Sequence, residues 1–158
     1  MTEDVMISLL ADATRIACGH TTPQHLDALH ASVEQAAGTP ARPDWGGKAA
    51  AYAEIFNVLA DMAPDRGTSA LLNRGTGFVY ALLTAAGRAA DGMTASSRDR
   101  FLSRLHLEEW EDAALEMEKH LRALRFMWRL ANPPARRPQA RRPEYSQGQE
   151  VQRTGTYG

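Results

Sequence analysis

Apolar residues recur every three to four positions along most of this chain, with polar residues between them. This spacing places the apolar side chains on one face of an α-helix, where they can pack against a common core. Alanine, leucine, arginine and glutamate are common, and these residues favour helices. The sequence contains no stretch that predicts a strand and no internal repeat. The pattern therefore predicts an all-α protein.

Six helices are predicted from this periodicity and from the residues that begin and end helices. They cover residues 3–18, 22–38, 48–63, 68–89, 96–105 and 108–131. Gly19 is expected to cap the first helix, and Thr22-Pro23 to begin the second. The third helix is apolar around most of its circumference, which is typical of a central helix. Gly75 and Gly77 interrupt the fourth. No predicted strand precedes them, which argues against a phosphate-binding loop, so a kink or helix junction is expected there.

Arg98 and His120 lie on the apolar faces of the fifth and sixth predicted helices. The face of Arg98 is shared with Phe101, Leu102 and Leu105, and that of His120 with Ala113, Met117, Leu121 and Leu124. A guanidinium keeps its charge, so burying it without an anionic partner is costly. The pair predicts a bundle interior that holds something negative. Two alternatives stay open: Arg98 could reach out to water along its stem, and His120 could be a core histidine satisfied by a neighbour.

The remaining histidines give little support for a metal or catalytic site. His20, His25 and His30 are five residues apart, a rotation of about 140° per step on a helix, so they do not share a face. They are expected at the surface, where His30 could pair with Asp27 or Glu34.

His106 precedes Glu108 and Glu109, but acids at a helix start are expected for electrostatic reasons alone. Catalysis by His106 is therefore disfavoured. Arg74, beside the two glycines of the fourth helix, could reach into a pocket.

The length of 158 residues predicts one domain with a core, over residues 1–131, followed by a tail. Cys18 is the only cysteine, which excludes an intrachain disulfide and favours a small buried side chain. No apolar run is long enough to cross a membrane, and the first residues do not resemble a signal peptide. A cytoplasmic protein is expected.

The tail, residues 132–158, is rich in proline, glutamine, arginine and glycine and is expected to be disordered. It carries five arginines and two glutamates, a balance of +3, which leaves −4 for the residues before it because the whole chain carries −1. An acidic body argues against nucleic acid as the main partner.

The order of these segments resembles the FCD domain, the effector-binding domain of GntR-type bacterial transcription regulators. The resemblance covers about residues 7–131 and includes the segments LLADATRIA, TTPQHLDALHASVEQAAG, AAYAEIFNVLADMA and RFLSRLHLEEWEDAALEMEKHL. Its most specific part is A-x-x-x-M-x-x-H-L, formed by Ala113, Met117, His120 and Leu121.

The resemblance implies a metal position that this sequence lacks. Many members of the family bind a divalent ion with one Asp and three His, and those positions fall here on Ala53, Asn57, Arg98 and His120. One imidazole cannot hold a metal, so neither a metal site nor another cofactor is expected. Arg98 would place a fixed cation where the metal charge would be, which suits direct binding of an anion.

The resemblance also implies a function. The chain is expected to be a six-helix antiparallel bundle that binds a small organic anion, most simply a carboxylate, in a pocket between the third, fifth and sixth helices. Arg98 would clamp the anion and His120 would donate a hydrogen bond to it. Asn57, Arg74 or Tyr80 would tune selectivity, and a homodimer is expected from the family.

Two other functions remain open at this point. The sequence offers no counterpart of the winged helix-turn-helix of GntR regulators, so the chain is expected to be either an excised effector domain or a free-standing relative, without sequence-specific DNA binding of its own. The pocket could instead serve a metal-independent enzyme for proton transfer, cyclisation or lyase chemistry, with His120 as acid or base and Arg98 as oxyanion stabiliser. A partner-binding module with a filled core is the third possibility.

Overall fold

Helices make up nearly all of the described chain. The computed structural model describes residues 1–134, and the predicted tail lies outside the described residues from position 135 onward. The elements are α1 (Glu3–Cys18), α2 (Pro23–Ala37), α3 (Trp45–Ala53), α4 (Ile55–Met62), α5 (Arg66–Ala86), the 3-10 turn η1 (Arg88–Ala90), α6 (Asp91–His106) and α7 (Trp110–Ala131). No strand occurs in residues 1–134, so the all-α prediction is confirmed.

The first two helices have the predicted boundaries. Gly19 follows α1, and its N–H bonds back to the carbonyls of the last turn. At the start of α2, the Thr22 hydroxyl accepts from the His25 amide, and His25 Nδ1 accepts from the Thr22 amide. This reciprocal capping box, followed by Pro23, satisfies amides that have no partner within the helix. His25 thus has a structural role that its spacing from the other histidines did not indicate.

The third predicted helix is divided at Glu54 into α3 and α4. The Glu54 amide is shared between the carbonyls of Ala50 and Ala51, at 3.2 and 3.3 Å. The Asn57 amide then bonds to the Glu54 carbonyl at 2.9 Å, three residues back. This short stretch of tighter bonding ends one helix and starts the next, and apolar periodicity continues through it. The prediction of one continuous helix is wrong at this position.

Helix α5 runs without a break through Gly75 and Gly77, so the predicted interruption is wrong. A Cβ added to Gly75 would lie 2.6 Å from Cδ2 of Leu10 on α1 and 3.4 Å from Cδ1 of Phe56 on α4. Gly75 therefore allows three helices to approach closely, and packing outweighs its low helix propensity. The helix ends at Gly87, whose φ of +79° suits a glycine.

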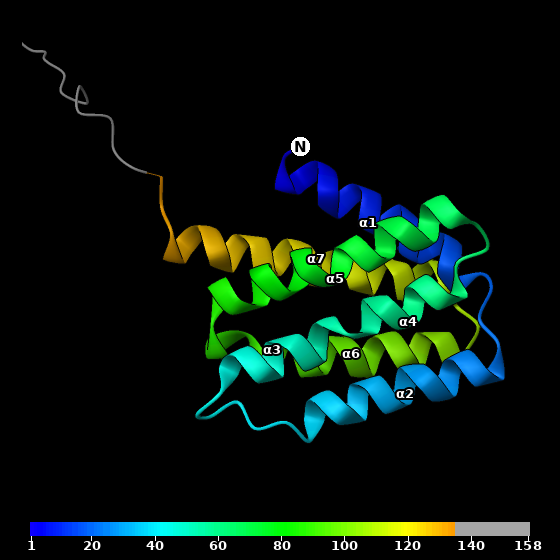
Figure 1. The fold of residues 1–158 in the computed structure, drawn as a ribbon, viewed down its shortest axis with the longest axis horizontal. Coiled ribbons are helices and arrows are strands. Elements are labelled where there is room, and N and C mark those ends of the chain that lie inside the picture. The colour runs from blue at the N-terminus through cyan, green and yellow to red at the C-terminus, as the bar shows by residue number, and fades with distance from the viewer. Residues whose placement is uncertain (135–158) are drawn as a thin grey trace, which may run out of the picture.

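Helix α7 packs against α1, α5 and α6. Figure 1 shows α2 along the lower edge of the bundle, with α3 and α4 between α2 and α5, and α2 also packs against α6. The core is filled mainly by aliphatic side chains from all seven α-helices, including the fully buried Ile7, Leu29, Ile55, Leu83 and Leu105. Of the described helices, none has the length and apolar character that a membrane span needs.

Candidate anion-binding site

Arg98 is one of the largest fully buried side chains of the protein, with 1% of its surface exposed. Its position on α6 is set by the apolar face it shares with Phe101, Leu102 and Leu105, which are also buried. The alternative that the side chain reaches out to water is therefore wrong. The guanidinium instead lies where α3, α6 and α7 meet.

The guanidinium has only neutral partners among the described residues. Nη2 donates to the Tyr52 carbonyl at 3.2 Å, and Nη1 lies 3.4 Å from His120 Nδ1 and 3.5 Å from Met117 Sδ. Nε has no hydrogen-bond partner, and Arg98 forms no ion pair within residues 1–134. Burial lowers the pKa of Arg98 to about 10, so the group remains charged at neutral pH.

His120 is buried beside Arg98, and its tautomer follows from its two partners. Arg98 can only donate, so Nδ1 of His120 must accept. The proton therefore lies on Nε2, which donates to Thr94 Oγ1 at 2.9 Å. Burial, and then the charges of Arg98 and Arg100, hold the pKa of His120 well below its usual value. The ring is neutral, and its N–H already has a protein partner.

A groove between α6 and α7 reaches His120 from the surface. Its volume is about 400 Å³. It is lined by Met93, Ser97, Arg100, Glu116, Lys119, His120 and Ala123. Arg100 bonds to Glu116 at 2.9 and 3.1 Å, and the Ser97 hydroxyl donates to the same carboxylate at 3.0 Å. Two cations and one anion leave the rim with a positive balance, and His120, which lines this groove, also contacts Arg98.

Asp91, which bonds to the Tyr52 side chain, is held by partners other than Arg98. Tyr52 Oη donates to Asp91 Oδ1 at 2.5 Å, and the half-shielded Asp91 also lies 3.7 Å from Lys48 Nζ. Lys48 is itself buried and donates to the Thr39 carbonyl at 2.8 Å. Burial, and then the bond to Asp91, raise the pKa of Tyr52. Lys48 and Tyr52 thus neutralise and bind Asp91, and the charge of Arg98 is left without a carboxylate.

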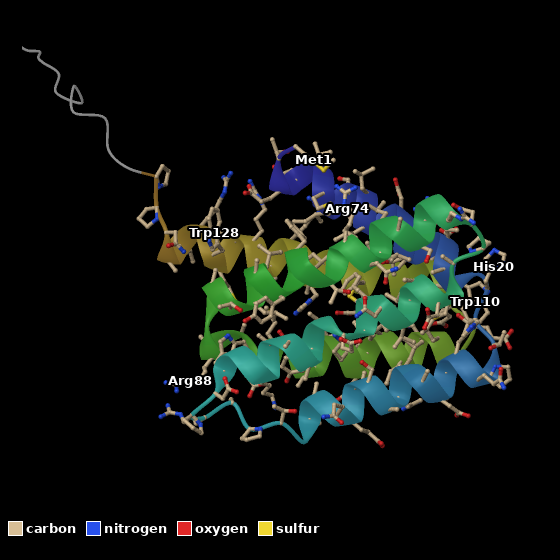
Figure 2. All side chains as sticks on the ribbon, in the orientation of Figure 1. Met1, His20, Arg74, Arg88, Trp110 and Trp128 are labelled. Carbon is tan, nitrogen blue, oxygen red and sulfur yellow. The ribbon has the colours of Figure 1, made fainter. Side chains whose placement is uncertain are left out.

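The structure brings together two of the five predicted ligand-binding residues. Asn57 is half-buried; its amide donates to Glu54 Oε2 at 2.9 Å, and its oxygen accepts from the Thr76 hydroxyl at 2.8 Å. Arg74 and Tyr80 are exposed on α5, and Figure 2 shows Arg74 near α1. None of the three forms a hydrogen bond or ion pair with Arg98 or His120.

Three contacts of the site were missed in the sequence. Thr94 lies outside the predicted fifth helix, because α6 begins at Asp91 rather than at Ser96. Four residues separate Thr94 from Arg98, which places both on one helical face, so a correct helix start would have found it. The Tyr52 carbonyl could not be found, because side-chain periodicity does not show which backbone carbonyl an arginine on another helix can reach. Met117 was assigned to the core without a polar role.

The other predicted side chains have simple environments. Cys18 is fully buried, and burial raises the pKa of its thiol to about 12, which confirms the prediction of a small buried side chain. Glu109 accepts from Arg104 at 2.9 Å, whereas His106 contacts His30. Among residues 1–134, no group of three or more His, Cys, Asp or Glu side chains is placed to hold a metal ion.

Comparison with known proteins gave no match: no family model, no curated protein and no solved structure is similar to this chain.

Proposed function

We propose that this chain binds a small organic anion, a carboxylate in the simplest case, through the charge of Arg98. The observation that carries the proposal is a fully buried guanidinium whose contacts within the described chain are all neutral and whose Nε is unpartnered. A carboxylate that accepts from Nε and one Nη would supply the missing charge and the missing acceptor together. Such a bidentate pair is among the strongest hydrogen-bonded contacts that arginine makes.

The groove beside His120 gives this ligand an approach. Arg100 and Lys119 at its rim attract anions, and movement of the imidazole ring would connect the groove with the guanidinium. On binding, Arg98 would exchange its weak contacts with Met117 and His120 for the carboxylate. His120 would then be free to direct its N–H toward the ligand instead of Thr94.

The proposal extends to the resemblance to FCD domains. In this reading the helices form an antiparallel six-helix bundle with its pocket at Arg98, and the chain serves as the sensory part of GntR-type transcription regulation, as a homodimer. The order of helices and the A-x-x-x-M-x-x-H-L segment support this reading. Asn57, Arg74 and Tyr80 would enter the site only through a change in conformation, so the binding role rests on Arg98 and His120.

The enzymatic alternative has less support from the same geometry. A general base works best when its pKa lies near the working pH. His120 has a strongly lowered pKa, and both ring nitrogens are engaged by Arg98 and Thr94. A neutral, doubly bonded imidazole is suited to shaping a binding site rather than to proton transfer.

The test is an NMR titration of the full chain, labelled with ¹⁵N, with acetate, succinate and benzoate at constant ionic strength. Binding is expected to shift the Arg98 Nε–H resonance downfield, because that group gains its first acceptor. Native mass spectrometry of the purified protein would reveal any anion that is already bound.

The matched variants are Arg98→Met and Arg104→Met, which remove a buried and an exposed arginine from the same helix. Binding is expected to be lost in the first and retained in the second. Equal binding by both variants, or no response to any of the three probes together with an empty native mass, would reject the proposal.

A further inference from the structure

A second cluster lies at the surface, away from Arg98. His30 on α2 is half-buried, and His106, the last residue of α6, is exposed. Their Nε2 atoms are 2.6 Å apart, the ring centroids are 4.8 Å apart, and the ring planes meet at 48°. The pair joins residues 76 positions apart in the sequence, on two helices that pack side by side (Figure 1).

The two rings direct the same type of nitrogen at one point. Without a metal, one Nε2 carries a proton and donates to the other, which gives a single hydrogen bond between the two rings. If the proton of each ring lies on Nδ1 instead, two lone pairs converge from two helices. No described hydrogen bond holds either Nδ1, so nothing in residues 1–134 fixes the rings in the first arrangement.

We propose that His30 and His106 form a binding site for a divalent late transition-metal ion such as Zn²⁺ or Cu²⁺. Zinc binds imidazole nitrogen at about 2.0–2.1 Å, so two tetrahedral ligands lie roughly 3.3 Å apart. Opening the pair from 2.6 Å to that separation moves each Nε2 by less than about 1 Å, and each ring must also turn, because centroids only 4.8 Å apart place the two rings nearly end to end. The exposure of His106 leaves room for water in the remaining coordination positions.

The chemistry of the donors selects the metal class. Neutral imidazole suits zinc, copper and nickel, whereas magnesium and calcium prefer oxygen donors. Because only two protein ligands converge, the affinity is expected to be moderate, with Cu²⁺ bound more tightly than Zn²⁺. Bound metal would link α2 to α6 and thereby stabilise their packing.

This site is independent of the proposed anion site and of the metal position of FCD domains. That position maps to Ala53, Asn57, Arg98 and His120, none of which belongs to the His30–His106 pair. Helical spacing compared His30 only with histidines near it in the sequence, and a ligand from another helix could not be seen there. The sequence predicted no metal site anywhere in the chain, and the His30–His106 pair is proposed as an exception to that prediction.

The test uses the full chain without an affinity tag, freed of metal by chelation. Isothermal titration with ZnCl₂ is expected to give one site per chain, and the Cu²⁺ complex is expected to show an electron paramagnetic resonance spectrum with two equivalent nitrogen couplings. His30→Ala and His106→Ala are each expected to weaken Zn²⁺ binding by about tenfold or more, and to remove one nitrogen coupling.

The matched control is His20→Ala, because His20 is exposed and lies outside the pair. It is expected to bind Zn²⁺ like the unmodified chain. His30→Gln and His106→Gln repeat the test with side chains close in size, in case either alanine variant unfolds. Absence of Zn²⁺ and Cu²⁺ binding, or binding that neither His30 nor His106 substitutions weaken, would overturn the proposal.

Discussion

At the scale of single residues, Arg98 is surrounded by acceptors that compensate its charge poorly. A carbonyl, a thioether and an imidazole nitrogen hold it at 3.2 to 3.5 Å, all longer than a charge-assisted bond to a carboxylate. Removing a cation from water has a cost that such contacts offset only in part. The unliganded fold is thus expected to be less stable with arginine at this position than with an apolar residue of similar length.

Arg98→Met is expected to raise the free energy of unfolding by about 1–3 kcal/mol, as replacement of poorly compensated buried charges by apolar side chains can do. Urea unfolding of the metal-free and anion-free protein measures the change. Arg104→Met, at the surface of the same helix, is expected to leave the midpoint nearly unchanged. A large loss of stability in Arg98→Met would instead mean that the arginine holds α3, α6 and α7 together.

His120 makes stability depend on pH. Its pKa in the folded protein is held well below the usual value of 6.5, so the unfolded chain binds a proton that the folded one does not. The free energy of unfolding is therefore unaffected by this histidine well above pH 6.5. It decreases as the pH drops below 6.5, by up to about 1.4 kcal/mol per pH unit for this one proton. Urea unfolding between pH 7 and pH 5 is expected to show this decline.

The matched pair for this prediction is His120→Gln and His20→Gln. The first removes the buried titrating group and is expected to make the pH dependence shallower, whereas the second alters an exposed histidine and leaves the dependence as it was. Identical slopes in all three proteins would show that His120 does not contribute to acid sensitivity.

Periodicity was sufficient to identify Arg98 and His120 as inward-facing, since both lie on apolar helical faces. It could not assign the tautomer of His120, which depends on Thr94 and Arg98 meeting the ring from opposite sides. Nor could it place Arg74 or Tyr80, because the face of α5 that packs inward depends on where its neighbours lie.

At the scale of elements, the two glycines of α5 show how packing can override intrinsic propensity. Gly75 lies at the contact with Leu10 and Phe56, whereas a Cβ added at Gly77 would meet no atom within 4 Å. The sequence presents the two residues alike, and the prediction of an interrupted helix treated them alike. Only the close approach of α1 and α4 distinguishes the glycine that packing requires from the one that it merely permits.

Gly75→Ala and Gly77→Ala are expected to change stability in opposite directions. Alanine at 77 gains about 0.5–1 kcal/mol of helix propensity with no clash. At 75 the same gain is opposed by crowding against fully buried Leu10, and overpacking of this kind costs about 1–3 kcal/mol. Thermal unfolding is expected to show a higher midpoint for Gly77→Ala and a lower one for Gly75→Ala. A gain in both variants would mean that Leu10 can move aside.

At the scale of the whole molecule, sequence patterns predicted the fold class and most helix boundaries. Local signals supplied these features: the caps at Gly19 and Thr22, and apolar spacing of three to four residues. The pairing of helices was not predictable in the same way, because an amphipathic face indicates that a helix packs but not against which partner. The contact of α2 with α6, which brings His30 and His106 together, is one of the helix pairings that the sequence did not predict.

Cys18 offers a probe of how cooperatively this bundle unfolds. It is fully buried at the end of α1, which packs against α4, α5 and α7, and its pKa of about 12 leaves almost no thiolate at pH 8. If α1 separates only when the whole bundle unfolds, iodoacetamide is expected to label Cys18 at least about a thousandfold more slowly than an exposed thiol. Ser103→Cys in a Cys18→Ala background provides that exposed thiol on α6.

The labelling rate can be converted into a free energy of opening and compared with the free energy of unfolding in urea. Equal values are expected, because Cys18 is enclosed by core side chains contributed by several helices. A clearly smaller opening free energy would show that α1 detaches on its own while the remaining helices stay folded. In that case Leu10, which fills the space beside Gly75, would leave with it, and the Gly75→Ala variant would be labelled faster than the unmodified chain.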